Sequence, residues 1–228
     1  MHNRVALLAL AAAGLLAAAP VSAQTTGTVT LTDPGHVTNT RVTGTVSGHI
    51  YGAGSFYVSP YIGTLDGQKV FLYCVDFTHN VNVGDSWTAN VTSLGADFTG
   101  STTRFNNADA YRQAAWMTTH SAGYSAEDLQ DAIWYLFYPQ VWAGGLTPTN
   151  PQFDNAANLV QLAQSQILSA DDFSYFKILT DNTPDPITGE KQEFLVQVTP
   201  EPASLVLLAT GLIGIVGVTR RRRRTASV

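Results

Sequence analysis

The chain has 228 residues, of which 45% are hydrophobic and 13% charged, a composition that argues against disorder and allows one domain with a sizeable core. Six of the twelve basic residues are Arg4 and the arginines at positions 220–224, while all seventeen acidic residues lie between Asp33 and Glu201. The central region therefore carries six basic residues against seventeen acidic ones. This charge argues against nucleic-acid binding, because phosphate contacts need clustered cations.

The first 23 residues have the features of a secretory signal peptide. Arg4 leads into an alanine- and leucine-rich run, and small residues precede a predicted cleavage between Ala23 and Gln24. We therefore expect an exported domain over residues 24–199. Cys74 is the only cysteine of the chain, so it has no partner for an internal disulfide.

Residues 25 to about 100 are predicted to be β-structure. Val42, Val46 and Ile50 lie among threonine, serine and glycine, as in half-buried strands. Asp66-Gly67 favours a hairpin turn because these residue types tolerate positive φ. The nearly continuous apolar run at residues 69–77 predicts a central strand that contains Cys74 or ends near it. A further strand is expected over residues 86–91.

Helical periodicity follows. Asn106 or Asn107 is placed to cap a helix over residues 108–120. Ser125 and Asp128 form a capping-box pattern, which predicts a second helix that stops at Pro139.

The last predicted elements are a third helix from Pro151 to about Ser169 and two strands over residues 173–179 and 194–198. Strands, then helices, then strands predict an α+β fold. We expect a β-rich ectodomain, sandwich- or barrel-like, with an inserted helical segment.

A primary amide lies on the apolar face of the second helix. Gln130 shares this face with Ile133, Trp134 and Phe137, and an amide in such surroundings needs a partner. Cys74 offers an unusual one. A thiolate that attacks a side-chain amide carbonyl expels ammonia and leaves a thioester, provided that the groups are held together and shielded from water. Tyr73, Trp134 and Trp116 are the aromatic residues predicted to line such a site.

The same residues resemble a known family. Tyr73-Cys74-Val75-Asp76 and Leu129-Gln130-Asp131-Ala132-Ile133-Trp134 resemble the thioester domains of Gram-positive surface adhesins, although Leu129 stands where many of those domains have threonine. The resemblance implies that Cys74 and Gln130 are the bond-forming pair and that the protein attaches covalently to amines or hydroxyls of a partner. The residues alone leave a second interpretation open, in which Cys74 is an inert core residue and Gln130 a surface amide.

The C-terminus resembles the PEP-CTERM sorting signal of Gram-negative bacteria. A Pro-Glu-Pro motif precedes an apolar segment at residues 203–219 and an arginine cluster within a signal that we place at residues 200–228. The resemblance implies a transient inner-membrane helix, recognition by an exosortase, and transfer to the cell surface or an exopolysaccharide-rich matrix. A plain single-span anchor is the alternative. The sorting residues are Pro200, Glu201, Pro202, Arg220, Arg221, Arg222, Arg223 and Arg224.

No other pattern predicts a catalytic or metal site. The histidines at positions 36, 49, 79 and 120 lack metal-ligand spacing, and the pair Asp171-Asp172 is typical of a solvated turn. Cys74 and His79 lack an evident third group for nucleophilic catalysis. We therefore expect neither an enzyme nor a cofactor. The predicted function is that of an exported covalent adhesin, and the alternative is a non-catalytic exopolysaccharide-associated matrix or carbohydrate-binding module with an inert Cys74.

Overall fold

The computed structural model describes residues 25–39, 44–46, 49–51, 55–139, 153–182 and 190–198. The predicted signal peptide, the cleavage between Ala23 and Gln24, and the sorting signal from Pro200 onwards lie outside these residues. Within the described part, no helix has the length and apolar character needed to cross a membrane.

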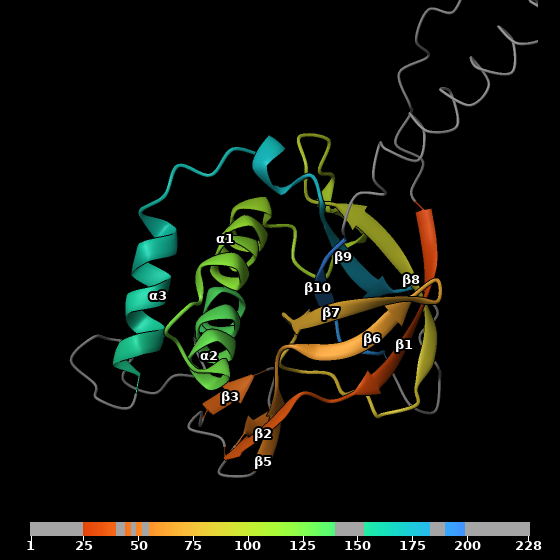
Figure 1. The fold of residues 1–228 in the computed structure, drawn as a ribbon, viewed down its shortest axis with the longest axis horizontal. Coiled ribbons are helices and arrows are strands. Elements are labelled where there is room, and N and C mark those ends of the chain that lie inside the picture. Colours follow the sequence, from red (N-terminus) through yellow and green to blue (C-terminus); the bar gives the residue numbers. More distant parts are fainter. Residues whose placement is uncertain are drawn as a thin grey trace, which may run out of the picture.

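Six antiparallel strands form a closed barrel in the order β1-β6-β7-β10-β9-β8 (Figure 1). The first strand closes the barrel, because it pairs with β6 on one side and with β8 on the other. Short ribbons of β2 with β5 and of β3 with β4 complete the β-structure. The barrel strands are β1 (Thr25–Asp33), β6 (Tyr61–Leu65), β7 (Gln68–Cys74), β8 (Ser86–Ser93), β9 (Phe176–Asp181) and β10 (Phe194–Gln197), and the ribbon strands are β2 (His36–Asn39), β3 (Gly44–Val46), β4 (His49–Tyr51) and β5 (Ser55–Val58).

Three helices lie on one side of the barrel (Figure 1). They are α1 (Ala108–His120), α2 (Ala126–Phe137) and α3 (Asp154–Gln164). Of these, α1 packs against β10, and α2 packs against β5 and β7, while α3 packs on the other two helices. The prediction of a β-rich fold that contains helices is therefore confirmed. Of the two predicted forms, sandwich-like and barrel-like, the structure has a closed barrel.

Local sequence signals set several element boundaries. The β6–β7 hairpin turns at Asp66 and Gly67, whose φ angles are +51° and +81°. The Asn107 side chain accepts a hydrogen bond from the backbone N–H of Ala110 and so caps α1. Ser125 and Asp128 form the predicted capping box of α2. These turns and caps depend on neighbouring residues only, so the sequence was sufficient to place them.

Three predicted boundaries are corrected. The third helix ends at Gln164 instead of Ser169, and its first residue is Asp154, while Pro151 lies outside the described residues. The central strand ends at Cys74 instead of residue 77, because the Asp76 carboxylate accepts a hydrogen bond from the N–H of Thr78 and turns the chain. Phe173 belongs to a short 3₁₀ turn, and β9 begins only at Phe176.

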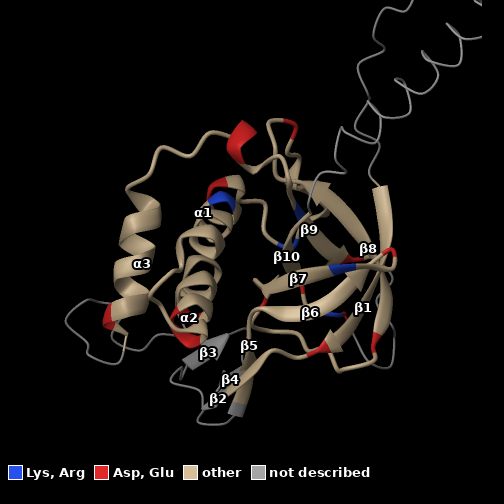
Figure 2. Cartoon of the chain, viewed as in Figure 1, with Lys and Arg blue, Asp and Glu red and all other residues tan. Residues whose placement is uncertain are grey.

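The barrel interior is filled by alternate residues of its strands. Cys74 lies directly opposite Phe194 in the β7–β10 ladder, and Leu72 lies opposite Val196. All four are completely buried, and Phe71, which points the other way from β7, is 51% exposed. Cys74 thus projects into the end of the barrel, where α2 crosses β7. Acidic residues lie mainly in loops and at helix starts, and basic ones are few (Figure 2).

The capping box of α2 gives a first prediction. Ser125→Ala removes the side-chain acceptor for the N–H of Asp128, so we expect the free energy of unfolding to fall by about 1 kcal/mol in urea titrations. Ser125→Asn keeps an acceptor at this position and should retain nearly all of the stability. Equal losses in the two variants would show that the cap does not stabilise α2.

Candidate functional site

Cys74 and Gln130 are brought together where α2 crosses the end of β7. Both side chains are completely buried. The Gln130 amide nitrogen donates a hydrogen bond to the backbone carbonyl of Cys74 at 2.7 Å. Residues that are 56 positions apart in the sequence therefore form a direct contact in the core.

Ser59 joins the two residues into one closed arrangement. Its backbone N–H donates to Oε1 of Gln130 at 3.0 Å, and its hydroxyl oxygen accepts a hydrogen bond from the N–H of Cys74 at 2.8 Å. Ser59 is completely buried in the turn between β5 and β6. The Gln130 amide thus has its oxygen fixed by the backbone of the β5–β6 turn and its nitrogen fixed by the backbone at the end of β7.

The thiol of Cys74 is held in its protonated form. Burial raises the pKa of the Cys74 thiol, and the nearby carboxylate of Asp76 raises it further. Sγ donates a hydrogen bond to the backbone carbonyl of Asp76 at 3.1 Å. A stable thiolate is therefore not expected in the resting site, and any reaction at sulfur must remove the proton in the same step.

Trp134 borders the thiol with an unused donor. Its side chain is 4% exposed, and its indole nitrogen has no hydrogen-bond partner among the described residues. Trp134 nevertheless counteracts part of the rise in the pKa of the Cys74 thiol, which places the indole N–H beside the sulfur. The N–H of Trp134 is thus a buried donor whose nearest described acceptor is the Cys74 sulfur, a weak one.

Further aromatic rings enclose the pair. Phe77 meets the Trp134 ring edge-on, with centroids 4.8 Å apart, and Tyr61 meets Phe194 edge-on at 5.7 Å. Burial raises the pKa of Tyr61, and the nearby Cys74 raises it further, so the phenol is also close to the sulfur. These rings keep water away from the Cys74–Gln130 contact.

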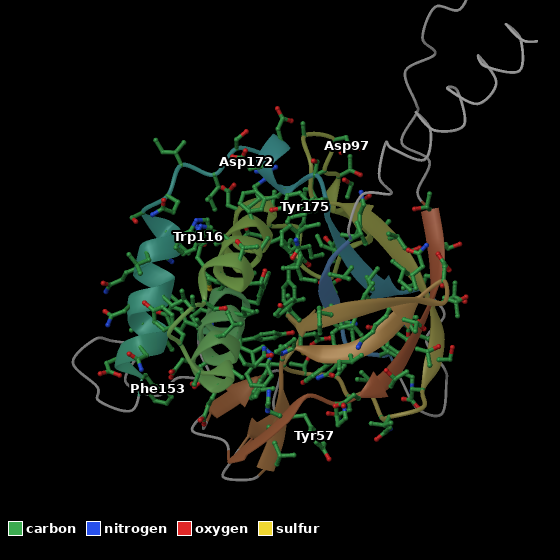
Figure 3. The ribbon with its side chains drawn as sticks, viewed as in Figure 1. Tyr57, Asp97, Trp116, Phe153, Asp172 and Tyr175 are labelled. Atoms are coloured by element: carbon green, nitrogen blue, oxygen red, sulfur yellow. The ribbon has the colours of Figure 1, made fainter. Side chains whose placement is uncertain are left out.

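The two other aromatic residues predicted for the site lie elsewhere. Trp116 stacks on His120 along α1, with centroids 4.2 Å apart and planes 6° apart, and Figure 3 shows it on the side of the molecule where α1 and α3 lie. Tyr73 points to the outer face of β7, opposite to Cys74, because side chains alternate along a strand. Of the three predicted rings, the structure thus brings only Trp134 to the pair.

A buried network of ionic and polar groups lies next to the thiol. Asp76 is completely buried and pairs with the Arg104 guanidinium at 2.9 Å and with His79 Nδ1 at 2.8 Å, and the Tyr138 hydroxyl donates to it at 2.9 Å. Burial alone would raise the pKa of Asp76, but the hydrogen bond from His79 and the charge of Arg104 outweigh it and lower the pKa. The carboxylate is therefore ionised beside a neutral thiol.

Glu193 continues this network towards the helices. It is completely buried, and its carboxylate accepts hydrogen bonds from Tyr111, Thr180 and the backbone N–H of Arg104. Burial raises the pKa of Glu193 against the effect of these bonds. Sequence reasoning missed Ser59, Arg104 and Glu193 as neighbours of the site, and it quoted Asp76 only as part of the motif around Cys74. The only local signal was the acidic Glu193 directly before an apolar strand.

No group of three or more histidine, cysteine, aspartate or glutamate side chains in the described residues is arranged to hold a metal ion. His79, which the sequence offers without a third group as a base for Cys74, is hydrogen-bonded to Asp76 and Arg104. The buried site thus contains the Gln130 amide carbonyl, the Cys74 thiol and two N–H donors, from the Ser59 backbone and the Trp134 indole.

Comparisons with known proteins address the C-terminus. Residues 198–224 match the PEP-CTERM protein-sorting motif. This match contains the Pro-Glu-Pro residues, the apolar segment and the five arginines, and it supports an exported protein that an exosortase processes. No curated protein and no solved structure matches the chain. The likeness to thioester domains therefore rests on the residues quoted above and on no comparison.

The buried Asp76 gives a second prediction. Its pKa is lowered relative to an unfolded-state value of about 3.9, so the ionised carboxylate stabilises the fold at neutral pH, and this contribution is lost as the pH falls through that value towards the folded-state pKa. Asp76→Asn leaves Arg104 without its buried partner, and we expect it to cost about 3–5 kcal/mol at pH 7. The variant should also lose less further stability than the parent between about pH 5 and pH 2.

Urea titrations across this pH range measure both effects. Asp97→Asn is the matched control, because Asp97 is an exposed carboxylate far from the site (Figure 3). It should follow the parent within about 0.5 kcal/mol. Parallel stability curves for the parent and Asp76→Asn would contradict the assignment of acid lability to this carboxylate.

Proposed function

We propose that this exported protein forms a thioester between Sγ of Cys74 and the side-chain carbonyl carbon of Gln130, and that the thioester attaches it covalently to an amine or hydroxyl on a surface partner. The observation that carries the proposal is the fixation of the Gln130 amide, between the N–H of Ser59 and the carbonyl of Cys74, in a completely buried site. Proximity and fixed orientation are what this reaction requires of a protein.

Bond formation would proceed in two steps, and one contact in the site supports the first. Sulfur attacks the amide carbon, and negative charge develops on Oε1, which already accepts the Ser59 N–H at 3.0 Å. The C–N bond then breaks, and the nitrogen leaves as ammonia with the thiol proton. The high pKa of the buried thiol fits this order, because no free thiolate has to persist before the attack.

The enclosure supports the survival of the product. A thioester hydrolyses in the presence of water, and Cys74, Gln130 and Ser59 are all completely buried. The unpartnered N–H of Trp134 lies beside the sulfur, where it has a thioester or its tetrahedral intermediate as an acceptor. In the subsequent transfer, the acceptor forms a bond to the Gln130 carbon, the C–S bond breaks, and the acceptor's proton passes to the sulfur. Each molecule reacts once and stays attached to its partner, so the protein acts as a covalent adhesin and not as an enzyme with turnover.

A second candidate function has an observation in its favour. The thiol already donates to the Asp76 carbonyl, and both ends of the Gln130 amide are already hydrogen-bonded to backbone. A polar clamp between α2 and the barrel needs nothing more than this. In that case the protein is a non-catalytic exopolysaccharide-associated matrix or carbohydrate-binding module, and its cysteine is inert.

Sorting gives a third prediction. If an exosortase cuts near the Pro-Glu-Pro motif, the mature protein recovered from the cell surface lacks Arg220–Arg224. Peptide mapping by mass spectrometry checks this. Recovery of the intact C-terminus through Val228 would contradict processing and support a plain membrane anchor.

The thioester gives a fourth prediction, and mass decides it. Freshly purified, non-denatured protein should weigh one ammonia less than its sequence requires, and Cys74 should become open to alkylation after treatment with a small amine. Both properties should disappear in Cys74→Ala and in Gln130→Ala. Gln164→Ala is the control, since Gln164 is exposed at the C-terminal end of α3, and it should keep the ammonia loss.

Slow alkylation by itself does not distinguish the two functions, because burial also hides an unmodified thiol. The full sequence mass, unchanged by amine treatment, would end the thioester proposal and leave the matrix-module function in its place.

A further inference from the structure

A cavity of about 200 Å³ is lined in part by Trp134, which lies one helical turn after Gln130 on α2. Five aromatic side chains line it: Phe56, Tyr57, Tyr61, Phe77 and Trp134. Phe77 stacks on Phe56 with centroids 6.1 Å apart and meets the edge of Trp134. Tyr57 lies at the end of the molecule formed by β2 and β5 (Figure 3) and is 51% exposed. The cavity therefore extends from the surface at Tyr57 to the buried ring of Trp134.

Two of these residues are shared with the candidate site. Trp134 lies one helical turn after Gln130 on α2, and Tyr61 follows two residues after Ser59, which holds both members of the pair. The lining residue Gln192 donates to the Asp76 carbonyl at 3.4 Å, and the Cys74 thiol donates to the same carbonyl at 3.1 Å. The inner wall of the cavity is thus also the wall of the Cys74–Gln130 enclosure. A molecule in the cavity would therefore contact side chains that lie next to the pair.

The polarity of the cavity indicates a neutral ligand. None of the described residues that line it is charged, and the polar groups include the amides of Asn80 and Gln192. Primary amides supply both donors and acceptors, which suits a ligand with several hydroxyls. A lysine ammonium would find no carboxylate in the lining, because the nearby Asp76 is engaged by Arg104.

The volume of the cavity and its aromatic lining narrow the class of ligand further. The volume is below the roughly 300–1,000 Å³ of pockets for drug-sized ligands, so it accommodates one ring-sized unit. The faces of aromatic rings carry negative charge density that attracts the slightly positive C–H groups on the face of a pyranose ring. Aromatic faces together with primary amides in the lining therefore suit a sugar better than a purely apolar ligand, which would offer these amides no hydrogen bond.

We propose that this cavity binds one neutral saccharide unit and that a hydroxyl of this unit is the acceptor for the thioester. The second half of the proposal rests on the proposed function. In the transfer, the oxygen of the sugar hydroxyl forms a bond to the Gln130 carbon, and the bond from that carbon to Sγ of Cys74 breaks. The hydroxyl proton passes to the sulfur. The product is an ester between the protein and the sugar, and Cys74 returns to the thiol.

Binding is tested without the reaction by using the full-length Cys74→Ala protein, which cannot form a thioester. Isothermal titration with maltose, cellobiose, lactose and mannobiose should detect saturable binding of at least one, whereas digalacturonic acid should bind more weakly because the lining holds no cation. The bound unit could be a free monosaccharide or the end unit of a longer saccharide chain. Comparing the binding of glucose with that of maltotetraose separates these two ligands. N-α-acetyllysine amide tests the amine as an alternative ligand.

Two exposed aromatic residues provide a matched pair of variants. Tyr57 in the cavity and Phe71 on the outer face of β7 are each 51% exposed. Tyr57→Ala, in the Cys74→Ala background, should weaken saccharide binding roughly three- to tenfold, as expected for the loss of one aromatic contact, while Phe71→Ala should leave it unchanged. Equal effects of the two substitutions would overturn the assignment of the cavity.

The outcomes separate this inference from the proposed function. The saccharide assignment is overturned if the parent has lost ammonia but Cys74→Ala binds no neutral saccharide. It is also overturned if Cys74→Ala binds the lysine amide alone. Either result leaves the thioester standing. Saccharide binding that depends on Tyr57, in a protein of full sequence mass, supports the binding site and overturns the acceptor role. Saccharide binding together with a sugar ester on Gln130 of the parent supports both.

Discussion

The amide of Gln130 is the interaction on which the rest of the structure depends, because it joins the helical layer to the barrel through backbone groups. Its oxygen accepts from the turn before β6, and its nitrogen donates to the last residue of β7. In a site without water, an amide that lost either bond would pay the full cost of a buried unsatisfied group. The position of α2 on the barrel is therefore specified as much by this polar contact as by the apolar packing of Ile133 and Trp134 around it.

The buried charges near this amide are paired within a network of their own. Asp76 and Arg104 neutralise each other behind the thiol, and Glu193 is satisfied by three donors on its other side. The Cys74–Gln130 pair thus lies between an ionic network and an aromatic wall. Trp134 and Phe77 of this wall also line the cavity that opens to the surface at Tyr57.

The sequence predicted what depends on near neighbours and missed what depends on long-range packing. The Ser125–Asp128 box, the Asp66-Gly67 turn and the cap at Asn107 follow from residues within one turn of each other. Trp134 was placed correctly because it is one helical turn from Gln130. Trp116 was not, because its direction depends on how α1 lies against the other helices, and Ser59 gave no local sign of its role 15 residues before Cys74.

The end of the barrel and the beginning of the sorting motif adjoin in the chain. β10 ends at Gln197, and the N–H of Val198, the first residue of the motif, still donates to the Tyr175 carbonyl at 2.9 Å. A fully extended chain covers at most about 3.6 Å per residue, so the Pro-Glu-Pro residues remain within about 15 Å of the ordered barrel. An exosortase that recognises this motif therefore has to act close to the folded barrel, because the motif begins at the residue that follows the last strand.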